Sequence, residues 1–123
     1  MPHRILVVED EEELSILIRL MMKIKQADWE LLSATDGRES LKRVEEFQPD
    51  LILLDIMLPS LDGIAVCQTL RQDPRWAKTK IVMLTALDDS RTRQRALAAG
   101  ADDYWTKPIL PDELLNGVLK ILG

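Results

Sequence analysis

Three short runs of consecutive apolar residues stand out along the chain, at positions 5–8, 51–54 and 81–84. Runs of this length are typical of strands that are buried on both faces, as in the centre of a parallel sheet. Two weaker runs, at positions 29–34 and 102–106, are interrupted by polar residues, and we expect them to form the edge strands. The run at 51–54 leads directly into Asp55, after which Pro59 and Asp62-Gly63 indicate a loop.

Between these runs, apolar residues recur at the three- and four-residue spacing of amphipathic helices. The predicted helices cover positions 11–25, 36–47, 63–70, 88–99 and 111–122. Alternation of strands and helices predicts a parallel sheet with helices on both faces. With the most apolar strands in its centre, the sheet has the order 2-1-3-4-5 of a doubly wound, flavodoxin-like α/β fold with five strands and five helices. We expect residues 1–123 to form one domain.

The composition is that of an ordinary globular domain, and we expect it in the cytoplasm. The chain is 46% hydrophobic and 30% charged, and its apolar runs are far too short to span a membrane. Cys67 is the only cysteine, so no internal disulfide is expected, and the first strand begins too early for a signal peptide. The net charge of −5 argues against direct binding of nucleic acid by this chain.

Polar side chains follow four of the predicted strands, namely Glu9 and Asp10, Asp55, Thr85, and Lys107. We expect them to meet, because ligands of open α/β sheets bind at the carboxyl ends of the strands. Three carboxylates in one place repel each other, and Mg²⁺, which prefers carboxylate and phosphate oxygens, would relieve that repulsion. Asp55 is central and is predicted to accept a phosphoryl group as an acyl phosphate. Lys107 would supply positive charge and Thr85 a hydroxyl donor.

Six segments of the chain follow one another in a highly specific order and spacing. They are Val7-Val-Glu-Asp-Glu11, Asp50-Leu-Ile-Leu-Leu-Asp-Ile-Met-Leu-Pro59, Asp62-Gly63, Met83-Leu-Thr-Ala86, Gly100-Ala-Asp-Asp-Tyr104 and Lys107-Pro108. Together they resemble the receiver domain of response regulators, the phospho-accepting module of two-component signalling, over essentially the whole chain. The resemblance implies that a sensor histidine kinase or a phosphotransfer protein supplies the phosphoryl group. It also implies a signalling module that catalyses only its own phosphotransfer and slow dephosphorylation.

The resemblance further implies a role for individual residues. Mg²⁺ would be surrounded by acidic side chains and one main-chain carbonyl, those of Glu9, Asp10, Asp55 and Met57. Lys107 would pair with the phosphoryl group, and its peptide bond to Pro108 would be cis. Thr85 would move to the phosphoryl group, and Tyr104 would change rotamer with it. The glutamate at position 9, in place of aspartate, is a mild departure from the family pattern.

Two other classes of protein share parts of this pattern. A phosphatase of the haloacid dehalogenase type also forms an aspartyl phosphate, but it normally has a second Asp where this chain has Met57, and the chain has no cap domain. A mononucleotide- or flavin-binding domain of flavodoxin type would need a phosphate loop after the first strand, where this chain has glutamates at 11–13. Turnover of small phosphate esters would favour the phosphatase, and a yellow protein would favour the flavin binder.

The apolar stripes of the fourth and last predicted helices indicate which surface responds to phosphorylation. The fourth helix has a thin stripe that includes Ala96 and Leu97, so we expect it to be loosely held. The last helix carries Leu115 and Leu119 beside its main stripe, which is typical of a partner site. We expect these two helices and the fifth strand, with Tyr104, to bind a downstream protein target. The sequence leaves open whether the chain forms a homodimer.

The lifetime of the phosphorylated state also follows from the resemblance. In receiver domains, two residues flank the path of the water that attacks the acyl phosphate, two positions beyond the phosphoacceptor and two beyond the conserved Thr. Here they are Met57 and Leu87, which cannot orient water by hydrogen bonds. We therefore expect a comparatively long-lived phosphorylated state. No role is derived for Trp29, Trp76 or Trp105, and we expect Trp105 to be exposed.

Overall fold

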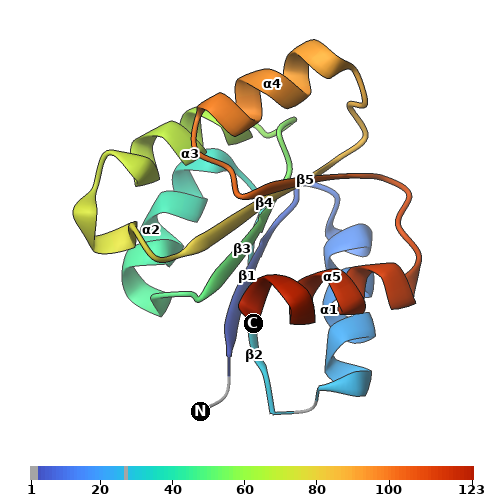
Figure 1. The fold of residues 1–123 in the computed structure, drawn as a ribbon. Coiled ribbons are helices and arrows are strands. Elements are labelled where there is room, and N and C mark those ends of the chain that lie inside the picture. Colours follow the sequence, from blue (N-terminus) through green and yellow to red (C-terminus); the bar gives the residue numbers. More distant parts are fainter. Residues whose placement is uncertain (1–2, 27) are drawn as a thin grey trace.

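The computed structural model describes residues 3–26 and 28–123 and contains one sheet of five parallel strands in the order β2-β1-β3-β4-β5 (Figure 1). The strands are β1 (Arg4–Val8), β2 (Glu30–Ala34), β3 (Leu51–Leu54), β4 (Lys80–Thr85) and β5 (Asp103–Thr106). The helices are α1 (Glu12–Lys25), α2 (Gly37–Phe47), α3 (Gly63–Arg71), α4 (Ser90–Ala98), α5 (Pro111–Leu122) and a short 3₁₀ helix, η1 (Pro74–Trp76). The predicted fold class and strand order are confirmed.

Each central strand contributes to two hydrophobic cores, one on each face of the sheet. Helices α1 and α5 cover one face and α2, α3 and α4 cover the other (Figure 1). Along β1, Ile5 and Val7 face the α1/α5 side, whereas Leu6 and Val8 face the other side. This division follows from the two-residue period of a strand, and it explains why the central strands need consecutive apolar residues.

The register of the sheet brings the polar residues after β1 and β3 to the same level. Val8 pairs with Leu54, and the Asp55 amide donates to the Val8 carbonyl at 3.0 Å. Between β4 and β5, Thr85 pairs with Thr106, and the Lys107 amide donates to the Thr85 carbonyl at 2.8 Å. The ends of four strands therefore build one edge of the sheet, as the sequence predicts.

The predicted boundaries of the strands and the five main helices hold to within two residues, and the shift at the start of α4 has a local cause. Helix α4 begins at Ser90 rather than at position 88, because Asp89 caps it by accepting from the Thr92 amide at 3.0 Å. The segment after α3 forms η1, whose N-cap residue Asp73 accepts from the Arg75 amide at 3.0 Å. Gly100 has a φ of 111° and ends the α4 region in a left-handed conformation, which glycine adopts readily after a helix.

The three tryptophans belong to the packing of the domain. Trp29 and Trp76 are buried in the two cores. Trp105 is only half-buried, and its ring lies against Gly117 of α5, so the expectation of an exposed Trp105 is wrong. Within the described residues, none of the helices has the length and apolar character that crossing a membrane requires.

Candidate functional site

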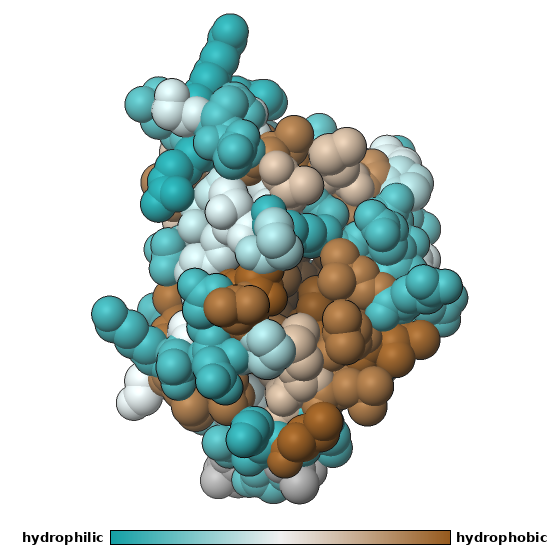
Figure 2. Space-filling model, turned by 90° about the vertical axis from the view of Figure 1, so that its right-hand side faces the viewer, coloured by the Kyte–Doolittle hydropathy of each residue, from teal (hydrophilic) through white to brown (hydrophobic). Residues whose placement is uncertain are grey.

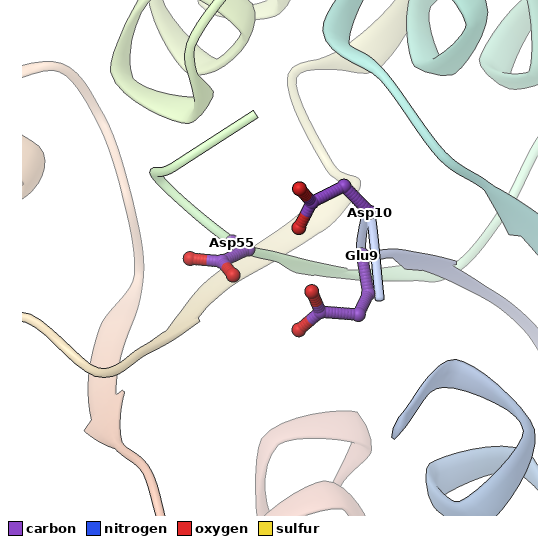
Figure 3. Close-up of side chains that lie close together, drawn as sticks. All are labelled: Glu9, Asp10 and Asp55. Atoms are coloured by element: carbon purple, nitrogen blue, oxygen red, sulfur yellow. The ribbon is translucent and has the colours of Figure 1, made fainter. Parts of the chain in front are cut away.

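Three carboxylates gather where β1 and β3 end (Figure 3). Glu9 and Asp10 follow β1 and Asp55 follows β3, and one oxygen of each lies within 4.8 Å of the others. Glu9 and Asp55 are buried, whereas Asp10 is exposed. The site is therefore an acidic pocket with one side open to solvent.

Lys107 reaches this pocket from the end of β5. Its Nζ donates to Asp55 Oδ2 at 2.8 Å and also to Glu9 Oε1. Burial lowers the pKa of Lys107, but the hydrogen bonds to the two carboxylates outweigh it and raise this pKa overall. The ammonium group therefore remains charged at neutral pH. The Lys107-Pro108 peptide bond is cis.

One ammonium group does not balance three carboxylates. Burial raises the pKa of Glu9, and the hydrogen bond from Lys107 opposes this shift only in part. A group of hard, anionic oxygen donors with one open side is suited to Mg²⁺, which binds through one or two carboxylates, waters and phosphate oxygens. The residues present therefore fit the ion that the acidic pocket implies.

Met57 follows Asp55 in the β3–α3 loop, at the rim of the pocket. Its amide donates to Asp55 Oδ1 at 3.2 Å, and its side chain is 59% exposed. The amide contact keeps the Met57 backbone next to the Asp55 carboxylate. The Met57 thioether has no hydrogen-bond donor and is only a weak acceptor, so it is poorly suited to orient a water molecule near the pocket.

The main chain of Leu87 links Thr85 to Tyr104. Thr85 is completely buried, and its Oγ1 accepts from the Leu87 amide at 3.4 Å. The Tyr104 hydroxyl donates to the Leu87 carbonyl at 2.5 Å, so the phenol ring points inward in this structure. Burial raises the pKa of Tyr104. The Arg93 guanidinium from α4 lies over the ring, 5.5 Å from its centroid. The sequence shows the residue types but not this connection, because it depends on tertiary geometry.

The apolar stripes of α4 and α5, which the sequence assigns to the surface that responds to phosphorylation, are only partly exposed. Leu119 of α5 is 42% exposed, whereas Leu115 is half-buried and packs against the α1/α5 core. On α4, Ala96 is the one residue that is fully buried, while Leu97 is 41% exposed and does not belong to the inward stripe. Helix α4 is thus held by even less apolar contact than expected.

A second surface beside the pocket was not predicted. An apolar groove of about 580 Å³ runs between α1 and the β5–α5 loop, and it appears as a brown hollow in Figure 2. Its lining includes Leu14, Leu17 and Met21 from α1, Ile109 from the loop, and Lys107 at the edge of the acidic pocket. The only signal in the sequence is that α1 has more apolar residues than one buried stripe needs, of which Leu17 is 51% exposed.

Comparison with known proteins gives a consistent assignment. The family model of the response regulator receiver domain matches residues 5–119. The alkaline phosphatase synthesis transcriptional regulatory protein PhoP of Bacillus subtilis is 46% identical over 99% of this chain and 49% of its own length. The phosphate regulon transcriptional regulatory protein PhoB of Rhizobium meliloti is 43% identical over 97% of this chain and 52% of its own length. The chain thus spans about half the length of these relatives.

Solved structures agree with this assignment. The receiver domain of Francisella response regulator 1452 superposes with a TM-score of 0.87 at 31% identity, covering 98% of this chain and 96% of that one. The BeF₃-activated DrrB receiver domain gives a TM-score of 0.87 at 29% identity, covering 99% and 98%. The phosphatase and flavin-binding alternatives find no support in these matches. The chain belongs to the response regulator receiver domain family, a family of signalling modules.

Proposed function

We propose that this protein accepts a phosphoryl group on Asp55 and that the acyl phosphate switches a protein-binding surface. The observation that carries the proposal is the position of the Asp55 carboxylate, which is buried at the end of β3 beside the Glu9 and Asp10 carboxylates and accepts from the Lys107 ammonium group. An aspartate so placed has a fixed cation beside it and room on the open side of the pocket for a phosphoryl group.

In the proposed reaction, an Asp55 oxygen forms a bond to the phosphorus of a phosphohistidine. The bond from phosphorus to the imidazole nitrogen breaks, and the nitrogen keeps the electron pair and takes up a proton from water. Glu9, Asp10, Asp55 and the Met57 carbonyl would hold Mg²⁺, which neutralises charge on the phosphoryl oxygens when bound. Lys107 would pair with one phosphoryl oxygen and Thr85 would donate to another. The experiment that tests this proposal is incubation with acetyl phosphate, with Mg²⁺ or with EDTA, followed by intact-mass measurement.

The apolar groove between α1 and the β5–α5 loop suits the phosphoryl donor. A sensor histidine kinase or phosphotransfer protein must bring its phosphohistidine to the open side of the pocket. Lys107 connects the groove to the acidic pocket, because it lines the groove and its Nζ donates to Asp55 Oδ2 in the pocket. An apolar helix of the donor seated on Leu14, Leu17 and Met21 would therefore place its histidine near Asp55.

The switch would act through the Leu87 main chain. If Thr85 turns toward the phosphoryl group, the bond from the Leu87 amide to its Oγ1 is lost and the Leu87 carbonyl shifts. The Tyr104 hydroxyl then loses the acceptor that holds the ring inward, and α4, with one fully buried residue, is free to move. Such a change is a population shift between two conformers. The surface formed by α4, β5 and α5 would bind the downstream protein target.

We expect beryllofluoride with Mg²⁺ to change amide exchange in α4, β5 and α5, which form the proposed surface. The Leu87 main chain bonds to Tyr104 of β5, and Arg93 of α4 lies over the Tyr104 ring. Hydrogen-exchange mass spectrometry with and without the mimic measures this directly. Changes confined to α1 and α2 would contradict the proposed surface. Light scattering on the same samples would show whether the target is a second copy of this chain.

The phosphorylated state should be long-lived, because neither Met57 nor Leu87 can orient an attacking water. Replacing both, Met57→Asn with Leu87→Glu, should speed phosphate loss by about tenfold or more, since orientation of the water supplies that much. The measurement is the decay of the intact-mass signal after removal of acetyl phosphate. Loss within seconds from the unmodified protein, or an unchanged rate in the double variant, would show that these side chains do not set the lifetime.

A further inference from the structure

The β3–α3 loop, residues 57–61, is joined to the N-terminus of α2 by three hydrogen bonds. The Gly37 amide donates to the Pro59 carbonyl at 3.1 Å, and the Arg38 amide donates to Ser60 Oγ at 3.2 Å. The Ser60 hydroxyl in turn donates to Asp36 Oδ1 at 3.1 Å. Within residues 3–26 and 28–123, these are the hydrogen bonds that tie the loop to another part of the fold; its others stay within the loop or go back to Asp55 and Ile56.

The joint depends on two unusual backbone features. A Cβ on residue 37 would lie 1.8 Å from the Leu61 carbonyl oxygen and 2.6 Å from its carbon, so only glycine allows the loop to approach this closely. Ser60 has a φ of 65°, a left-handed conformation that a residue with a side chain seldom adopts. Both features are found where the loop meets α2. The same loop also packs Leu58 and Leu61 against the core on the α2 side of the sheet.

The loop begins with Met57, next to the acidic pocket. Its start is fixed by the end of β3, and its far end by Gly63, whose amide donates to the Ile56 carbonyl at 2.9 Å. Between these points, the backbone is held by the α2 joint together with the packing of Leu58 and Leu61 against the core. Metal sites tolerate errors in ligand distance of only about 0.2 Å. To bring a Cβ on residue 37 even to 3.0 Å from the Leu61 oxygen, the two backbones must separate by more than 1 Å (3.0 minus 1.8).

We propose that Gly37 and Ser60 are positioning residues for the divalent cation, because their joint holds the loop that carries the Met57 carbonyl. The inference rests on the proposed function, in which that carbonyl binds Mg²⁺. Neither residue touches the ion. They act by fixing a main-chain ligand that cannot be adjusted by choosing another side-chain rotamer.

The test is the dissociation constant for Mg²⁺, measured by NMR titration of the Glu9 and Asp55 amides at a temperature where every variant is folded. Gly37→Ala should weaken Mg²⁺ binding by about 10- to 100-fold, the usual effect of disturbing groups that support metal ligands. Ser60→Gly keeps the left-handed backbone accessible and removes only the hydroxyl, so a smaller loss in the same direction is expected. In both variants, amide exchange without Mg²⁺ should be faster in residues 57–61.

Gly117→Ala is the matched control. A Cβ there would lie 2.8 Å from the Trp105 ring, so the variant is also crowded, but on the far side of the sheet. It should lose stability and keep the Mg²⁺ affinity of the unmodified protein. Unchanged affinity in Gly37→Ala and Ser60→Gly would overturn the inference while leaving the proposed function intact, and so would an equal loss in Gly117→Ala. No Mg²⁺ binding by the unmodified protein would overturn both.

Discussion

Replacing Asp55 with Asn should reduce phosphorylation by acetyl phosphate to background and also abolish the stabilisation that Mg²⁺ gives the unmodified protein. The amide of Asn is not a nucleophile toward phosphorus at neutral pH, so the acyl phosphate cannot form. The substitution also removes one of the three carboxylates that make the pocket acidic. Without Mg²⁺, the variant should therefore be more stable than the unmodified protein, because a repulsion between buried charges is gone.

Asp50→Asn is the control for this prediction. Asp50 lies at the opposite end of β3, where its Oδ2 accepts from the Arg4 amide at 2.8 Å, far from the acidic pocket. Its replacement should leave phosphorylation and the effect of Mg²⁺ unchanged. The measurements are intact mass after treatment with acetyl phosphate, and thermal unfolding with and without Mg²⁺. Phosphorylation that persists in Asp55→Asn would mean that another residue accepts the group.

Replacing Lys107 with Met should have the second large effect, both on the reaction and on stability. The ammonium group is the one fixed cation that contacts Asp55 and Glu9 in the structure, and loss of such a group from a reaction that develops charge typically costs about 100-fold in rate. Removing it also leaves two buried carboxylates without their partner, at a cost of about 3 to 5 kcal/mol of unfolding free energy.

The stability loss in Lys107→Met should depend on pH in a defined direction. Burial raises the pKa of Glu9 and the Lys107 hydrogen bond lowers it, so without Lys107 this pKa rises further in the folded state. The folded variant then binds a proton that the unfolded chain does not bind. Its stability should therefore increase as the pH falls from neutral toward about pH 5, and Mg²⁺ should restore stability at neutral pH.

Urea unfolding of Lys107→Met across that range, with and without Mg²⁺, measures the effect. The control is Lys80→Met, because Lys80 is exposed at the start of β4, at the opposite end of that strand from Thr85. Its replacement should change neither the phosphorylation rate nor the pH dependence. A Lys107→Met variant as stable as the unmodified protein at neutral pH would show that the ion pair does not offset the burial of Glu9 and Asp55.

The strand order and the location of the site could be predicted because they depend on local signals. Apolar runs without interruption indicate strands buried on both faces, and the residue that ends each run, such as Asp55, then falls on the ligand-binding edge. Capping residues also act locally: the helix predicted from position 36 begins where the Asp36 side chain accepts from the Glu39 amide.

What the sequence could not provide depends on side-chain direction and on contacts between distant segments. The resemblance to receiver domains implies that residue 87 lies near the path of the attacking water, but only the fold shows its main chain bonded to both Thr85 and Tyr104. Likewise, Leu115 and Leu119 look equivalent on a helical stripe, yet one packs against the core and the other is exposed. Gly37 appears to be an ordinary helix start until Leu61 is placed beside it.

The most direct test of the central claim is to identify the residue that is modified. The protein is incubated with acetyl phosphate and Mg²⁺, and the phosphorylated position is mapped by peptide mass spectrometry. The account predicts one phosphoryl group per chain, on Asp55, and none when EDTA removes Mg²⁺. Modification at another residue, or at Asp55 to the same extent in EDTA, would contradict it.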